Sequence, residues 1–139
     1  MKKVILIVAS LFVFSALVFA AKPPVKVQKA FEVKFPDAAS VKWAKESSKE
    51  WEAEFIVNSV KTSANFRTTG DWVETESQIN ISELPEAVTA EIKKLHPKGE
   101  ITAAFRIESA KDGTKYEADV RTGKKTAEVF LKEDGSILK

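Results

Sequence analysis

The chain has 139 residues, with 22 Lys and Arg, 20 Asp and Glu, and a formal net charge of +2. It contains no cysteine, which excludes disulfides, thiol catalysis, thiolate metal sites and a lipid anchor through cysteine. The near balance of charge gives no bulk electrostatic attraction for nucleic acid or for an anionic membrane, so neither is expected as a partner.

The N-terminus has the layout of a secretory signal peptide. Two lysines are followed by an uncharged run of 18 residues, from position 4 to position 21. Small residues favour cleavage after Ala20, so residues 1–20 are predicted to be removed, with cleavage after Ala21 as the second choice. A retained membrane anchor is the alternative, although a bilayer span usually takes about 20 residues. We expect an exported protein, periplasmic or secreted, with no stable membrane insertion after cleavage.

The remaining residues, 21–139, are expected to form one domain with two similar halves. In the first half, a helical stripe over 27–35 ends at Phe35-Pro36, and alternating residues predict strands over 41–44, 51–58, 60–67 and 72–77. In the second half, a helical stripe over 84–95 ends at His96-Pro97, and strands are predicted over 101–108, 116–120, 127–131 and 136–138.

Two short stretches indicate that the halves are copies of one unit. WEAEF begins at Trp51 and YEADV begins at Tyr116, 65 residues later, and both read aromatic, acid, Ala, acid, apolar. Gly70 and Gly135 keep the same offset of 65 residues, whereas the helices register at 61. An offset held across strand, turn and strand predicts tandem helix-plus-four-strand repeats over about 24–78 and 82–139.

The expected fold class is α+β, with an antiparallel sheet of about eight strands, both helices on one face and the other face open. Large apolar residues are predicted to point toward the helices: Trp51, Phe55, Phe66, Tyr116, Val120 and Leu131. Acids are predicted to form a solvated open face: Glu52, Glu54, Glu117 and Asp119. Basic residues are expected to be their cross-strand partners there: Lys61, Arg67, Arg106 and Arg121.

Several stretches carry a resemblance to a known family: AFEVKFPDAASVKW, WEAEF, TTGDWVETE, LPEAVTAEIKKLHP, YEADV and KEDGSIL. Together they cover essentially all of residues 21–139. In them the chain resembles the PepSY-like, beta-lactamase-inhibitor-like family of small exported bacterial proteins. The resemblance implies two tandem helix–sheet repeats and an exported location. It also implies a fold similar to that of proteins that inhibit beta-lactamase by gripping it with the open sheet face.

The sequence predicts no catalytic residue, no metal site and no cofactor. His96 is the only histidine, and we interpret it as a helix-terminal residue rather than a base or ligand. Paired acids on one strand face could act as general acid and base, but a solvated sheet face explains them more simply. Asp112-Gly113 and Asp134-Gly135 lack the spacing of a calcium loop and are predicted hairpin turns.

Two apolar residues, Ile56 and Phe130, are out of phase with the core stripes and are predicted to anchor a protein partner on the open face. Charged residues would set register and selectivity: Glu52, Glu54, Arg67, Arg106, Glu117 and Arg121. The favoured interpretation is a non-catalytic domain that binds an envelope or extracellular protein, with inhibition of an envelope hydrolase as one outcome. The alternative is an envelope protein that binds a small molecule or a metal ion, in the tryptophan-rich first half or on the acidic rows.

Overall fold

The computed structural model describes residues 21–138, so the predicted signal peptide and its cleavage after Ala20 lie outside the described residues. The elements, in chain order, are α1 (Val25–Lys34), β1 (Ala39–Lys45), β2 (Glu50–Val57), β3 (Val60–Arg67), β4 (Trp72–Ile79), the 3₁₀ helix η1 (Ile81–Glu83), α2 (Glu86–Leu95), β5 (Glu100–Ser109), β6 (Gly113–Thr122) and β7 (Lys125–Lys132). Within residues 21–138, no helix is long and apolar enough to cross a membrane.

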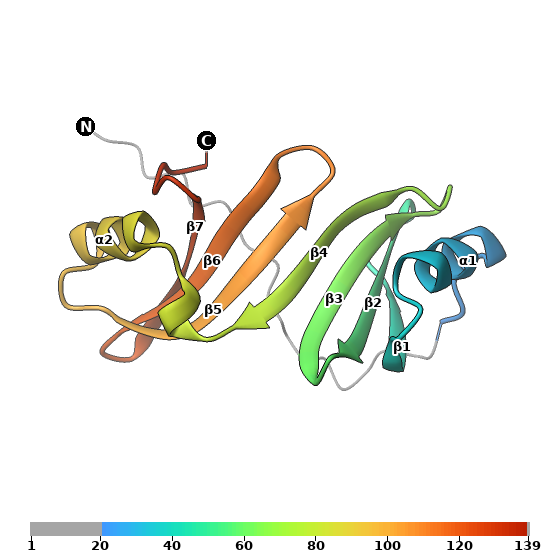
Figure 1. Cartoon of the computed structure of the whole chain (residues 1–139), viewed down its shortest axis with the longest axis horizontal. Coiled ribbons are helices and arrows are strands. Elements are labelled where there is room, and N and C mark those ends of the chain that lie inside the picture. The colour runs from blue at the N-terminus through green and yellow to red at the C-terminus, as the bar shows by residue number, and fades with distance from the viewer. Residues whose placement is uncertain (1–20, 139) are drawn as a thin grey trace.

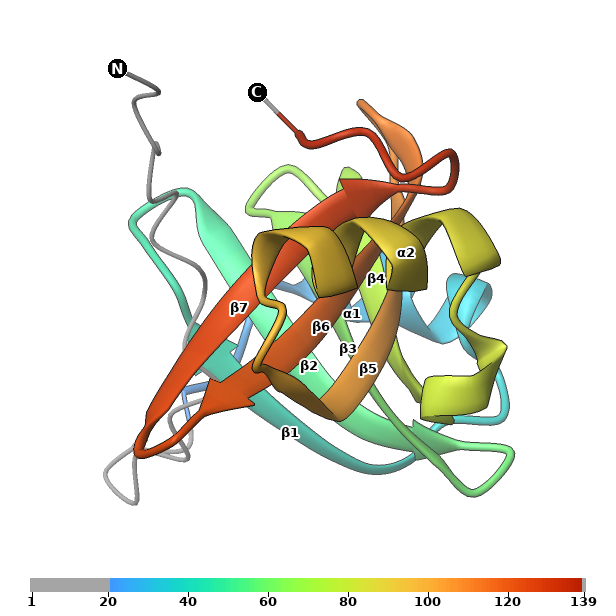
Figure 2. The same ribbon diagram turned by 90° about the vertical axis from the view of Figure 1, so that its left-hand side faces the viewer.

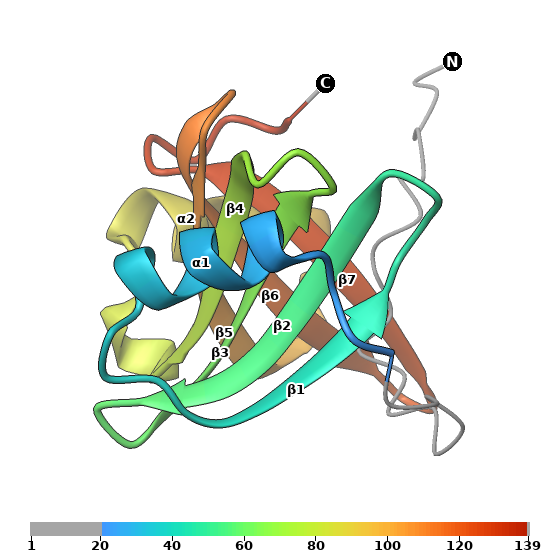
Figure 3. The same ribbon diagram turned by 90° about the vertical axis from the view of Figure 1, so that its right-hand side faces the viewer.

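Strands β1 to β7 form a single antiparallel sheet in which each strand pairs with the next one along the chain (Figure 1). The sheet is strongly twisted, and the strands at its two ends cross one another when viewed along the long axis (Figures 2 and 3). The sheet has seven strands rather than about eight. In the segment predicted as the last strand, Ile137 makes only an isolated bridge to Leu131.

Both helices cover the same face of the sheet, as the sequence predicts. Opposed residues of antiparallel strands share a face, and one unbroken row of partners joins the two halves. This row runs through Phe55, Thr62, Ser77, Arg106, Tyr116 and Leu131. Trp51 and Tyr116 therefore point to the same side.

Each helix covers its own hydrophobic cluster. Under α1, Val27 and Phe31 pack against Trp51, Phe55 and Phe66, together with smaller residues. The ring of Phe31 meets that of Phe55 edge-on, with centroids 5.0 Å apart. Burial of this aromatic surface is the main stabilising term for the first half.

The second cluster lies under α2 and is mostly aliphatic. Val88 and Ile92 pack against Val120, Leu131 and neighbouring residues of β5 to β7. Between the two clusters, on the helix side, β4 and β5 carry polar residues: Thr75, Ser77, Arg106 and Glu108. We call this uncovered polar strip the β4–β5 seam (Figure 1).

The position of Arg106 corrects the sequence-based prediction. Its Cα partners are Ser77 and Tyr116, so it lies on the helix face in the β4–β5 seam, where it forms an ion pair with Glu108. The cause is a bulge in the pairing of β5 with β6 between Ile101 and Ala103. An inserted residue reverses the alternation beyond it.

The same bulge moves two apolar residues to the side away from the helices. Ile101 packs against the α2 cluster, and Ala104 continues the helix face beyond the bulge. Phe105 and Ile107, which alternate with Ala104, consequently lie on the opposite side, where Phe105 pairs with Gln78 and Ile107 with Glu76.

The two halves share local geometry at positions that the sequence places in register. Pro24 and Pro85 precede the helices with nearly equal dihedral angles, φ −53°, ψ 148° and φ −54°, ψ 144°. Phe35 and His96 end them with φ −129°, ψ 67° and φ −130°, ψ 70°. Bulges also interrupt the first strand pair of each half, before Lys42 and before Ala103.

Each helix starts against a turn glycine of its own half. A Cβ added at Gly70 would lie 3.1 Å from the carbonyl oxygen of Lys26, and one added at Gly135 would lie 2.6 Å from that of Ala87. Both glycines have positive φ, +93° and +81°. The close approach of turn and helix therefore requires glycine twice over, for space and for conformation.

We predict that Gly135→Ala destabilises the protein far more than Gly113→Ala. Both glycines have positive φ, which costs an alanine about 1 kcal/mol, but a Cβ at Gly113 would meet nothing within 4 Å. The overlap with Ala87 adds an overpacking penalty, so we expect a loss of about 2–4 kcal/mol for Gly135→Ala. Urea unfolding of the two variants measures this difference, and equal losses would show that helix and turn are not in contact.

Candidate functional site: the open face of the sheet

We call the side of the sheet opposite α1 and α2 the open face, because neither described helix covers it. On this face Ile56 pairs with Lys61, and Gln78, Phe105, Glu117 and Phe130 pair in turn across β4 to β7. The adjoining Thr62–Ser77 pair aligns these two parts into one row. We call it the Ile56–Phe130 row. Ile56 is 40% exposed, and Phe105 and Phe130 are half-buried.

Sequence and structure agree on the two apolar residues at the ends of this row. Ile56 and Phe130 lie on the open face, as predicted. Phe105 joins them, and this was not predicted, because the bulge in β5 reverses the alternation that the sequence indicates. The row thus spans β2 to β7, five strand spacings, or roughly 24 Å along the sheet.

The predicted charged residues fall into two groups. Glu52, Glu54 and Glu117 lie on the open face, in the interiors of β2 and β6. Arg67 and Arg121 lie on it too, but near strand ends: Arg67 is opposite Glu50, and the Arg121 guanidinium donates to Glu100 at 2.7 Å. Neither arginine lies directly opposite one of the three predicted acids.

Two acids of this face are buried, and for one of them, Glu117, the predicted solvated position is wrong. Glu76 is 8% exposed and Glu117 is 5% exposed. Burial, followed by repulsion from neighbouring carboxylates, raises the pKa of both side chains above the usual range. Their mutual hydrogen bond raises the pKa of Glu117 and lowers that of Glu76.

Glu52 is a third carboxylic acid whose pKa is raised. Burial and a hydrogen bond with Glu46 raise the pKa of Glu52 to about 8, and the charges of Glu46, Glu54 and Glu76 add to the shift. The open face therefore carries fewer negative charges near neutral pH than its composition indicates.

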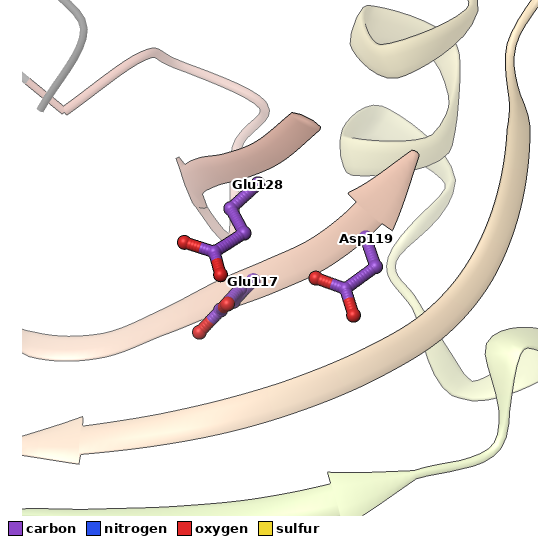
Figure 4. Close-up of side chains that lie close together, drawn as sticks. All are labelled: Glu117, Asp119 and Glu128. Carbon is purple, nitrogen blue, oxygen red and sulfur yellow. The ribbon is translucent and has the colours of Figure 1, made fainter. Parts of the chain in front are cut away.

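Three carboxylates gather at the β6–β7 end of the open face (Figure 4). Glu117 and Asp119 alternate along β6, and Glu128 of β7 is the Cα partner of Asp119. One oxygen from each of the three lies within 4.8 Å of the others, a spacing that can hold a metal ion. Burial raises the pKa of Asp119 and of Glu128, and the charge of Asp119 raises that of Glu128 further.

Sequence reasoning missed Glu76 and Glu128. Alternation along their strands indicates only which residues share a face, and both would have been read as ordinary solvated acids. Their proximity to Glu117 depends on which strand lies beside which, and this information is in the register.

The other candidate positions have structural roles. His96 ends α2, and its backbone N–H donates to the carbonyl of Ile92 at 2.8 Å, in agreement with a helix-terminal role. Trp43, Trp51 and Trp72 pack into the α1 cluster. The Trp72 indole N–H donates to Thr75 at 2.9 Å, and Lys34 Nζ lies 3.9 Å from its ring centroid.

We predict that stability falls as pH rises from 5 to 9, and that Glu52→Gln reduces this fall. The folded-state pKa of Glu52, about 8, lies above its ordinary value of 4.5. The folded protein therefore keeps a proton that the unfolded chain releases, and the resulting stabilisation is lost as pH rises toward 8. The pKa values of Glu76 and Glu117 are also raised, so these two residues also make the protein less stable as pH rises.

Thermal melts followed by circular dichroism at several pH values test this expectation. Glu133→Gln, which removes an exposed carboxylate from the turn after β7, is the matched control and should keep the wild-type slope. A melting temperature that increases between pH 5 and pH 9, or an unchanged slope in Glu52→Gln, would contradict it.

Solved structures of Bacteroides proteins share this fold. A BLIP-like protein of Bacteroides fragilis matches with TM-score 0.71 and 21% identity, over 86% of this chain and 85% of that chain. A "putative periplasmic" protein of Bacteroides eggerthii matches with TM-score 0.77 and 19% identity, over 86% and 88%. A DUF2874 family protein of Bacteroides ovatus matches with TM-score 0.74 and 21% identity, over 86% of both chains.

No curated protein matches the chain. A sequence family does match, over residues 49–139. The match leaves out α1 and β1, so it covers less of the chain than the resemblance noted in the sequence, which extends over residues 21–139. The matched residues include β2 to β7, and with them Glu117, Asp119 and Glu128. The chain therefore belongs to the family described as "Putative beta-lactamase-inhibitor-like, PepSY-like".

Proposed function

We propose that this protein is an exported, non-catalytic domain that binds a protein partner through the open face of its sheet. The observation that carries this proposal is the Ile56–Phe130 row, in which three apolar residues cross a face that the described helices leave uncovered. An enzyme of the cell envelope is the class of partner that we favour, with inhibition as the outcome of binding.

Export is supported by two observations. The N-terminal sequence has the basic start and apolar run of a signal peptide. The structurally similar protein of Bacteroides eggerthii is described as periplasmic. We propose the periplasm or the exterior as the site of action.

A paired sheet suits partner binding because its side chains are already held in place. The backbone donors and acceptors of β2 to β6 are used in the strand ladder on both sides, so docking does not need to order a loop. A preorganised surface loses less conformational entropy on binding than a flexible one. Ile56, Phe105 and Phe130 are then the apolar anchors, and anchors of this kind usually dominate the binding energy.

Charged residues around the anchors would select the partner. Glu52 and Glu54 lie in the strand that carries Ile56, and Arg67 and Arg121 lie at strand ends near the rim of the face. This arrangement favours a partner that presents basic groups to the middle of the face and acidic groups to its rim. Arg106 has no place in this set, because it lies in the β4–β5 seam.

A non-catalytic role is supported by the surroundings of the acids. A carboxyl pair that shares one proton can serve as acid and base in an enzyme, but Glu76 and Glu117 are only 8% and 5% exposed. A substrate could not reach their oxygens without displacing the side chains around them.

We further propose that the two halves are copies of one helix–sheet unit. The equal cap geometries, the matching bulges and the two helix–glycine contacts support this relationship. In the second copy the fourth strand is reduced to the bridge between Leu131 and Ile137, whose counterpart in the first is the Phe66–Trp72 pair.

We predict that Phe130→Ser and Ile56→Ser each weaken partner binding about tenfold or more, as expected for anchors at an interface. Serine removes apolar surface without adding charge next to Glu117 or Lys61, which are the Cα partners of the two residues. Val33→Ser is the matched control, because Val33 is also apolar and is 84% exposed on α1.

The experiment is affinity capture from an envelope extract, followed by titration of the captured protein in purified form. A protein retained by wild type and by Val33→Ser, but lost with both open-face variants, supports the proposal. Thermal melts of all variants check folding. Capture that Phe130→Ser and Ile56→Ser leave unchanged would show that the open face is not the interface.

A further inference from the structure

The carboxylates of Glu117, Asp119 and Glu128 form a compact group that needs positive charge (Figure 4). The four ion pairs found in residues 21–138 do not include any of the three. The nearest bases along the same strand are engaged elsewhere: Lys115 pairs with Glu74, and Arg121 pairs with Glu100.

A fourth carboxylate supplies an independent observation. Glu76 comes from β4 and is 8% exposed, and its Oε1 atom is buried without a hydrogen-bond partner in the described structure. Glu76 and Glu117 lie on the same face on either side of β5, as the Cα partners of Ile107 and Phe105, and the two side chains are hydrogen-bonded. Glu76 therefore borders the group. A buried acceptor without a donor is unfavourable, and a cation bound between the four carboxylates would satisfy it.

The composition of the group favours one ion over the other. Its ligand oxygens lie within 4.8 Å of one another. Ca²⁺ accepts several carboxylate oxygens in flexible geometry, whereas Mg²⁺ demands a near-ideal octahedron, keeps several waters and usually takes one or two carboxylates. The all-oxygen ligand set is the one that hard cations prefer.

We propose that Glu117, Asp119 and Glu128 bind a divalent cation, Ca²⁺ in preference to Mg²⁺, with Glu76 as the buried fourth carboxylate. Asp119 and Glu128 are half-buried, which leaves a side from which water completes the coordination. Apolar residues flank the site, since Phe105 and Phe130 are the cross-strand neighbours of Glu117. The site does not depend on partner binding, and each proposal can fail without the other.

Calorimetric titration of the purified protein with CaCl₂, and separately with MgCl₂, tests the proposal. We expect one Ca²⁺ per chain with a dissociation constant of about 0.1–1 mM, the range of modest extracellular sites, and weaker binding of Mg²⁺. At 10 mM Ca²⁺ the melting temperature should rise by about 5–10 °C. NaCl at equal ionic strength is the control for screening.

Asp119→Asn and Glu128→Gln should each weaken Ca²⁺ binding at least tenfold and remove the Ca²⁺-dependent rise in melting temperature. Without Ca²⁺, both variants should melt at or above the wild-type temperature, because each removes a repelling charge. If Asp119 and Glu128 had a purely structural role, the substitutions would instead lower the melting temperature. Glu108→Gln, which removes a carboxylate from the helix face, should bind Ca²⁺ like wild type.

Three results would overturn the site. They are the absence of saturable heat up to 10 mM Ca²⁺, a rise in melting temperature that NaCl reproduces, or equal Ca²⁺ binding by Asp119→Asn, Glu128→Gln and wild type.

Discussion

Continuous antiparallel pairing from β1 to β7 determines which side chains can meet on either face. Because opposed residues share a face, the row from Phe55 to Leu131 fixes the packing side for both helices at once. A single bulge before Ala103 then determines which residues of β5 lie on the open face. It moves Phe105 and Ile107 to the open face and Arg106 away from it. The proposed anchors and the carboxylate group are both consequences of this backbone register.

The same register brings acids together where solvent is scarce. Glu117 lies between Phe105 and Phe130 in its row and contacts Glu76 across β5. Taking carboxylates from water and placing them near like charges is unfavourable, and protonation of Glu117 relieves only part of the penalty. Such arrangements persist chiefly where a protein uses them. The fold is stabilised by the clusters under α1 and α2, which allows the open face to be locally unfavourable.

Much of the fold could be predicted from sequence because its signals are local. Proline after Phe35 and after His96 ends each helix, and alternation identifies β2, β3 and the face of Ile56 and Phe130. The side of Arg106 could not be predicted, because a period of two does not reveal a bulge. Glu76 and Glu128 could not be identified either, since their roles depend on neighbours in other strands. The last predicted strand has the right composition but forms only one bridge.

The β4–β5 seam has a mechanical consequence. Close-packed side chains resist deformation, and here the packed layers end at the two clusters. In between, the halves are joined by the backbone ladder and by small or charged groups such as Ser77 and Arg106. Resistance to bending is therefore expected to be lowest along this line, parallel to the strands. Strain imposed on the sheet would concentrate there and leave both cores intact.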